Sequence, residues 1–107
     1  MRQIEFEILL TLATGERHGY AIIQDIEARS SGALTVETGT LYRALQRLAE
    51  ETLVRLTDPP RGLPGDDERR RFYAITAEGR RAAAAEARRM ASLVDAARRA
   101  SLIPGRS

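Results

Sequence analysis

The chain contains no cysteine, lysine, asparagine or tryptophan, and it has no long apolar run. Without cysteine, disulfides and thiolate metal sites are excluded. No apolar segment approaches the roughly 18 residues that a membrane-spanning helix needs. Glu5 and Glu7 also interrupt the N-terminal stretch, which would stay apolar in a signal peptide. These absences predict a cytoplasmic protein with no membrane partner.

Patterns that would indicate catalysis are also missing. His18 is the only histidine, and the carboxylates show no tight ligand spacing that would complete a metal site around it. Ser30, Ser31 and Asp25 form no supported nucleophilic triad with it. No glycine-rich loop ends in the Gly-Lys-Ser/Thr of a phosphate-binding motif. We therefore expect no enzyme, no cofactor and no metal, and we interpret His18 as a turn or packing residue.

The basic residues are 17 arginines, and the net charge is only +2. Residues 77–107 hold seven arginines and three acidic residues, whereas residues 37–76 hold seven of each. The net charge alone therefore does not locate a nucleic-acid surface. At 107 residues the chain forms one small domain. Such a chain buries a limited share of its surface, which favours help from a partner chain.

Hydrophobic spacing predicts three helices before any strand. Apolar residues recur at helical intervals in residues 3–13, 20–29 and 38–50, and glycine-containing turns separate the segments. The expected core positions are Ile4, Ile8, Leu9 and Leu12, then Ile22, Ile23 and Ile26, then Leu41, Ala44, Leu45 and Leu48.

The period then changes to that of strands. Residues 53–57 and 70–76 are short and rich in β-branched or aromatic residues, with the Pro/Gly/Asp-rich "DPPRGLPGDDE" between them. Thr76 is a natural N-cap for a helix over residues 77–101. The order predicts a mostly α fold with a small β-hairpin. That order is typical of a winged helix-turn-helix. We therefore expect a DNA-binding domain of this kind over residues 1–76, followed by a C-terminal dimerisation helix and short tail over residues 77–107.

The third helix, "TGTLYRALQRL", places hydrogen-bond donors and no acid opposite its leucines. Its free N-terminal amides suit phosphate oxygens, and arginine and glutamine reach base edges. Any exposed helix carries such residues for solvation, but a third helix that precedes a hairpin favours DNA recognition. The outward residues are Gly39, Thr40, Arg43, Gln46 and Arg47, with Tyr42 on the flank.

The stretch "GDDERRRFYAIT" fits the wing of this fold. Its acidic residues would lie at the tip, and Arg69, Arg70 and Arg71 would enter the returning strand. Strand alternation sends Phe72 and Ala74 to one face and Arg71, Tyr73 and Ile75 to the other. These arginines either contact the minor groove and its phosphates or pair with Asp66, Asp67 and Glu68.

The last helix carries a coiled-coil seam. Ala83, Ala87, Met90, Val94 and Ala97 recur at spacings of 4, 3, 4 and 3. A symmetric dimer built on this seam would present two recognition helices to a pseudo-palindromic site in double-stranded DNA. The alternative is that the seam packs on the first helix of its own chain.

Three motifs, "HGYAI", "TGTLYRALQRL" and "RFYAITAEGR", occur in this order over roughly residues 4–94. With them the chain resembles the PadR family of bacterial transcriptional regulators, in its small subfamily with a single C-terminal helix. The resemblance implies a homodimeric repressor, with a small-molecule effector as in some members. The implied DNA-binding residues are Thr38, Gly39, Thr40, Tyr42, Arg43, Gln46, Arg47, Arg69, Arg70 and Arg71. The implied dimer interface is Ile4, Ile8, Ala83, Ala87, Met90, Val94 and Ala97.

The chain departs from that family pattern at three places. Glu37-Thr38 stands where Ser-Pro is frequent, Arg43 stands where proline is common, and Thr52 replaces a frequent glycine. Because a non-glycine residue resists the left-handed conformation, we expect a different, less relaxed turn at Thr52. The alternative function is a winged-helix protein-interaction module without DNA binding, which charge neutralisation by Glu37, Glu50 and Glu51 would favour.

Overall fold

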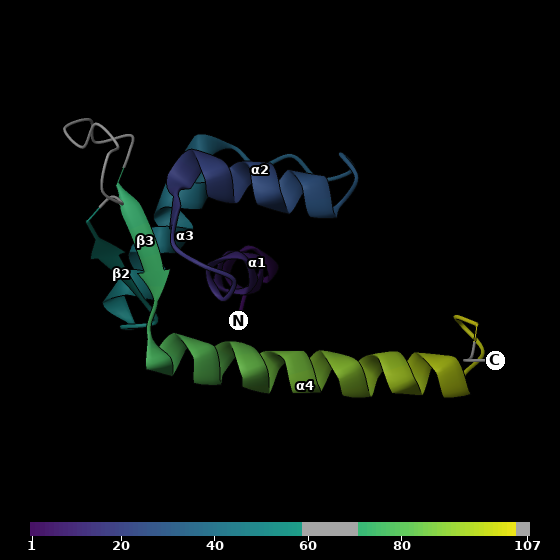
Figure 1. Cartoon of the computed structure of the whole chain (residues 1–107). Helices are drawn as coiled ribbons and strands as arrows, with labels where there is room; N and C mark the ends of the chain where they lie inside the picture. Colours follow the sequence, from purple (N-terminus) through teal and green to yellow (C-terminus); the bar gives the residue numbers. More distant parts are fainter. Residues whose placement is uncertain (59–70, 105–107) are drawn as a thin grey trace.

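The structure, a computed structural model, describes residues 1–58 and 71–104. Its fold is mostly helical with a small antiparallel sheet, as the sequence predicts (Figure 1). In chain order the elements are α1 (Gln3–Leu12), β1 (Arg17–His18), α2 (Gly19–Arg29), α3 (Thr38–Glu50), β2 (Val54–Thr57), β3 (Phe72–Ile75) and α4 (Ala77–Arg99).

The core is built around α1. This helix contacts α2, α3, α4 and β3, so every layer of the fold touches it. Ile8 and Leu9 are fully buried and Leu12 is 1% exposed. Burying each such side chain contributes roughly 1.5–3 kcal/mol. The cluster around them consists of Ile22, Ile23, Ile26, Leu41, Ala44, Leu45, Leu48, Val54 and Tyr73, which includes the core positions predicted for α2 and α3.

A polar cluster fastens α1 to α2. Thr11 has no exposed surface, and its hydroxyl donates a hydrogen bond of 2.6 Å to Asp25. Arg29 donates to Asp25 and to Glu7, each at 3.0 Å. The hydrogen bond from Thr11 lowers the pKa of the Asp25 carboxyl, against its desolvation and with the help of Arg29. Asp25 thus accepts the hydrogen bond of a hydroxyl that has no exposed surface, and Arg29 also donates to that hydroxyl, at 3.3 Å.

The sheet has three strands in the order β1-β3-β2, all antiparallel. The strand β1 was not predicted, because its two residues are too few to show a periodicity. Arg17 pairs with Tyr73 and His18 with Phe72, so β1 extends the predicted hairpin by one strand. Both faces of β3 are covered: Phe72 is 7% exposed and Tyr73 9% exposed. Burial raises the pKa of the Tyr73 hydroxyl, as expected for a phenol within the core.

His18 is a cap and packing residue, which confirms the interpretation from the sequence. Its Nδ1 accepts a 3.1 Å hydrogen bond from the backbone N–H of Ala21 and so caps α2. Its ring packs edge-on against Phe72, with ring centroids 5.6 Å apart. The only histidine is thus used to join the start of α2 to the sheet.

The turn after α3 corrects one expectation. Thr52 adopts the left-handed conformation, with φ of 62°. Its N–H donates to Ala49 and that of Leu53 to Leu48, which is the hydrogen-bond pattern of a Schellman turn. The expectation of a different kind of turn is therefore wrong, although a β-branched residue in this conformation is strained, as predicted. The Thr52 hydroxyl also donates to Glu78, which ties the turn to α4.

The helix α4 extends away from the rest of the molecule. The Thr76 hydroxyl accepts a 2.9 Å bond from the Gly79 N–H, so the predicted N-cap is confirmed. The first turns pack beside α1, with Ala83 against the core, and the C-terminal turns run beyond the other helices (Figure 1). Leu93 is 57% and Val94 40% exposed. A single chain therefore leaves much of the apolar side of α4 without a cover.

The described helices, α4 included, lack the combination of length and apolar composition that a membrane span requires.

Replacing Thr52 tests the strain in the turn. Thr52→Gly and Thr52→Ala both lose the hydroxyl contact with Glu78, so the difference between them reports the backbone alone. We expect the glycine variant to have the higher free energy of unfolding by about 1 kcal/mol, because a Cβ is disfavoured at positive φ. Urea denaturation of both variants measures this difference. Equal stabilities would contradict a left-handed turn at this residue.

Candidate nucleic-acid interface

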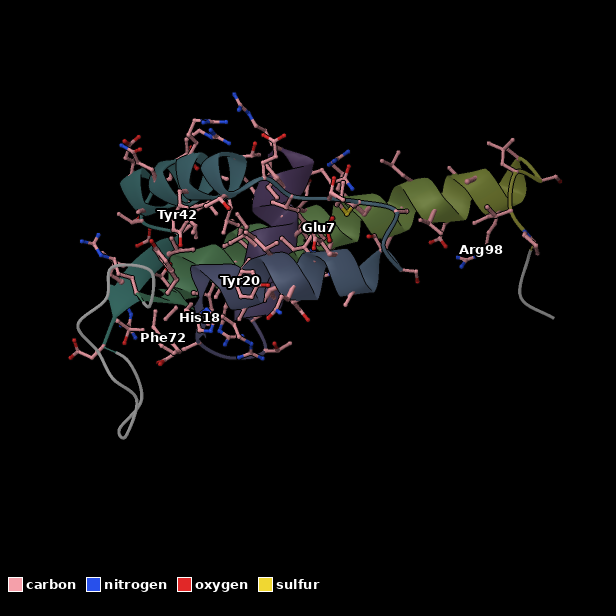
Figure 2. All side chains as sticks on the ribbon, turned by 90° about the horizontal axis from the view of Figure 1, so that it is seen from above. Glu7, His18, Tyr20, Tyr42, Phe72 and Arg98 are labelled. Carbon is pink, nitrogen blue, oxygen red and sulfur yellow. The ribbon has the colours of Figure 1, made fainter. Side chains whose placement is uncertain are left out.

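The position of α3 is set by its buried side. Leu41 and Ala44 are fully buried, while Leu45 and Leu48 are at most 2% exposed. These contacts fix the helix against α1 and α2 and turn its other side to solvent. Figure 2 shows α3 along one edge of the molecule, with side chains pointing away from the remaining helices. Such an outward-facing helix, after α1 and α2 and before a wing, has the geometry of a recognition helix.

The outward side of α3 presents a guanidinium and an amide. Arg43 and Gln46 are both exposed. Within the described residues, the one hydrogen bond of Arg43 is a long contact of 3.4 Å with the hydroxyl of Thr40. Both side chains thus keep donors that suit the base edges of the major groove. Within α3 the only acidic residue is Glu50, at its last position.

The N-terminus of α3 leaves amides without helical acceptors. The first intrahelical bond runs from the Leu41 N–H to the Glu37 carbonyl at 3.0 Å, so the amides of Thr38, Gly39 and Thr40 precede the helical ladder. Glu37 occupies the N-cap position, but its carboxylate makes no capping bond. These amides and the helix dipole favour an anion. The exposed Glu37 carboxylate opposes a close phosphate.

Tyr42 lies on the flank of α3 that faces α2. It is partly buried and packs against the core cluster. Its hydroxyl oxygen would lie 2.5 Å from a Cβ at Gly19, so only glycine fits at the start of α2. Tyr42 therefore positions α3 against α2, and its contact with DNA stays a prediction.

Arg47 lies on the opposite flank, beside α1. Its Nε donates to the Glu5 carboxylate at 2.9 Å. Burial raises the pKa of the Glu5 carboxyl, but hydrogen bonds from Arg47 and Arg2, together with their charges, outweigh it and lower that pKa below its ordinary value. Arg47 is thus engaged with α1 and stands at the edge of the outward surface. The sequence contains no signal for this pair, because its members are 42 positions apart.

The wing is described only at its base. Arg71 is exposed and directly precedes β3. Arg69, Arg70 and the acidic residues expected to pair with them lie outside the described residues. DNA contact and internal pairing therefore both stay predictions for these arginines.

Tyr20 is a candidate that the sequence analysis missed. It is the second residue of α2 and is 62% exposed. Figure 2 shows its ring on the outer side of α2. A hydroxyl there can donate to a phosphate. Its signal was within "HGYAI", where the apolar spacing of α2 leaves it off the core side.

The residues expected in a dimer interface lie mostly on α4. Ala87 and Val94 are exposed, and Ala83, Met90 and Ala97 are partly exposed. On α1, Ile4 is partly buried, whereas Ile8 is fully buried within its own chain and offers no surface to a partner. We therefore leave Ile8 out of the proposed interface.

An open groove of about 510 Å³ lies between α1 and the turn that leads into α3. Ile4, Leu34 and Val36 give it an apolar side, while Glu37 and Thr40 connect it to the start of α3. Among the residues that the structure describes, no three His, Cys, Asp or Glu side chains are grouped to hold a metal ion.

Known proteins share this sequence pattern and fold. The profile of the Transcriptional regulator PadR-like family matches residues 8–85. An uncharacterized protein of Lysinibacillus sphaericus is 30% identical over 73 residues, which cover 68% of this chain and 64% of that protein. The matched segment is thus less than two thirds of that relative.

Two solved structures illustrate the likeness in fold. A PadR family transcription regulator from Clostridium difficile superposes with a TM-score of 0.75 at 21% identity, covering 92% of this chain and 97% of that one. Bacillus subtilis PadR in complex with operator DNA gives a TM-score of 0.63 at 21% identity, covering 77% of this chain and 45% of that one. The resemblance seen in the motifs and the expected winged-helix fold are confirmed.

Gly39→Ala tests whether the backbone at Gly39 lies close to DNA, because it should lower DNA affinity without lowering the stability of the fold. A Cβ at Gly39 would lie 3.2 Å from the terminal nitrogen of Arg43, which is flexible enough to move. Alanine also favours the helix by up to about 1 kcal/mol. We therefore expect thermal unfolding to show equal or higher stability, while DNA affinity measured by fluorescence anisotropy falls. Unchanged DNA affinity would mean that no backbone approach occurs at this residue.

Proposed function

Because the chain belongs to the Transcriptional regulator PadR-like family, we propose that it is a repressor that binds a pseudo-palindromic operator in double-stranded DNA as a homodimer. The family is one of transcriptional regulators rather than enzymes. One observation carries the proposal: α3 is fixed by a fully buried leucine side and turns Arg43 and Gln46 outward with little to engage them. In this account these two side chains read bases in the major groove.

The contacts around α3 would hold the protein on the DNA backbone. The N-terminal amides at Thr38 and Gly39, the hydroxyl of Tyr20 and the wing arginines each suit phosphates. Arg71 contributes from the base of the wing, and Arg69 and Arg70 are proposed to contribute from the wing itself. Base contacts then supply specificity, and phosphate contacts supply affinity that falls with salt.

A second copy of the chain is the proposed cover for α4. Helix–helix packing along Ala83, Ala87, Met90, Val94 and Ala97 would bury the apolar side that one chain leaves exposed. Alanines along the seam permit close approach of the two helices. A two-fold axis through this contact presents both α3 helices to related half-sites.

We also propose that a small-molecule effector releases the protein from DNA. The groove beside Ile4, Val36 and Glu37 supports it, because a ligand there would touch the residues that begin α3. Movement of Glu37 and Thr38 would then change the approach of the helix N-terminus to DNA.

Arg43→Ala tests the proposed readout. Duplexes that bind the protein are first selected from a random library, and the best one is compared with a shuffled version. We expect unsubstituted protein to prefer the selected duplex by at least about tenfold. Arg43→Ala should lose roughly 1–3 kcal/mol on the selected duplex and much less on the shuffled one, because only the first offers a matching base edge. Fluorescence anisotropy at two salt concentrations measures both.

An equal loss on the two duplexes would assign Arg43 to the backbone and remove it from base readout. No binding of unsubstituted protein to any duplex at low salt would favour the protein-interaction module instead.

Val94→Glu tests the dimer. A carboxylate within the seam would be buried among apolar seam residues without a counter-ion, so we expect the dimer to dissociate. Ser92→Glu is the matched control, because Ser92 is exposed and lies on the other side of α4. Sedimentation should give twice the chain mass for unsubstituted protein and the control, and the chain mass for Val94→Glu. A dimer that survives Val94→Glu places the interface elsewhere.

A further inference from the structure

An ion pair joins the start of α1 to the last turn of α3. The Glu5 carboxylate accepts at one oxygen from the backbone N–H of Arg2, at 3.0 Å, and at the other from Arg47 Nε, at 2.9 Å. Only 13% of the Glu5 side chain is exposed. Because the N-cap of α1 holds one oxygen and α3 holds the other, this carboxylate has little freedom to turn.

Fixing Glu5 also fixes Arg47. An arginine side chain loses on the order of 1–2 kcal/mol of rotamer freedom when it is immobilised. Here the hydrogen bond at Nε already restricts the Arg47 side chain in the unbound protein, so less conformational entropy is lost when it binds a ligand. Arg47 keeps 33% of its side chain exposed. Across the described parts of the chain, neither of its two terminal amino groups has a hydrogen-bond partner.

The charges around this pair favour an anion. Arg2 is exposed, and its charge is close enough to act on Glu5. Arg2 and Arg47 outnumber Glu5 within this group, and in the described residues no hydrogen bond or ion pair joins either arginine to the exposed Glu50 and Glu51 that follow Arg47. The carboxylate is also the more buried partner, so an approaching anion meets the Arg47 amino groups first.

The place of Arg47 on α3 indicates which part of DNA it meets. At 100° per residue it falls on the flank shared with Thr40, whereas Arg43 and Gln46 occupy the centre of the outward side. A side chain at the edge of a recognition helix lies near the walls of the major groove, which are phosphates. This revises the role that the sequence suggested for Arg47.

We propose that Glu5 is a positioning residue for DNA binding, which holds Arg47, with Arg2 beside it, to receive a DNA phosphate at the edge of the groove that α3 reads. The inference rests on the proposed function, since it needs α3 to enter DNA. It assigns to a carboxylate a role that favours DNA binding, although its own charge repels DNA.

Glu5→Gln provides the test, because a loss of negative charge and a loss of positioning change the DNA affinity in opposite directions. Glutamine makes the surface more positive, so a purely electrostatic effect would tighten binding to every duplex. Loss of positioning instead weakens binding to the selected duplex, by about 3- to 10-fold. Glu50→Gln is the control for charge: it removes one exposed carboxylate from α3, and no hydrogen bond or ion pair joins Glu50 to Arg47 in the described residues. We expect this variant to bind DNA equally or more tightly.

Two further variants, Arg47→Ala and the double variant Glu5→Gln/Arg47→Ala, complete a set of four with the unsubstituted protein and Glu5→Gln. They show whether Glu5 affects DNA affinity through Arg47 or through the stability of the fold. Arg47→Ala should weaken binding to the selected and the shuffled duplex alike and lower the salt slope by about one. In that background Glu5→Gln should have no further effect on DNA affinity, even where it lowers the melting temperature. All four proteins are compared by anisotropy well below their melting temperatures.

Tighter binding by Glu5→Gln, or the same loss with and without Arg47, would overturn the inference. If unsubstituted protein does not distinguish the selected from the shuffled duplex, the proposed function fails instead.

Discussion

Burial of α1 is the constraint on which the other elements depend. This ten-residue helix is too short to be stable alone in water, and its apolar side is enclosed by α2, α3, α4 and β3. Polar bonds then fix its orientation: Thr11 and Glu7 reach α2, and Glu5 reaches α3. A shift of α1 would break these bonds together with the core contacts, so the helix acts as a rigid support.

That support has a direct consequence for recognition. Because α3 is fastened on its buried side by leucines and on one flank by Arg47, its outward side chains face solvent in a set direction. Tyr42 fastens the other flank over Gly19. A DNA-binding surface gains affinity when its side chains are ordered beforehand, since less conformational entropy is lost on binding. The same contacts that stabilise the fold thereby prepare the proposed interface.

Much of this architecture is predictable from the sequence where the signal is local. The bounds of α3, the N-cap at Thr76 and the core sides of α2 and α3 follow from periodicity and capping chemistry. The strand β1 was missed, since two residues show no alternation, and the left-handed turn at Thr52 was misjudged because tertiary contacts override local preference. The Glu5–Arg47 pair joins distant segments, and no sequence spacing reveals it.

In the proposed site, too, local features are predictable from the sequence and contacts between distant segments are not. Helical periodicity identified Arg43 and Gln46 as outward residues, and the structure places them there. It could not show that Arg47 is engaged by α1 or that Tyr42 is half-buried, because both facts depend on how three helices pack.

The most direct measurement is hydroxyl-radical footprinting of a selected duplex bound by the unsubstituted protein. A dimer that reads DNA through two copies of α3 should protect two tracts on one face of the duplex, with centres about ten base pairs or a multiple of that apart. A single short tract, or uniform protection along the duplex, would contradict a two-fold, sequence-specific regulator.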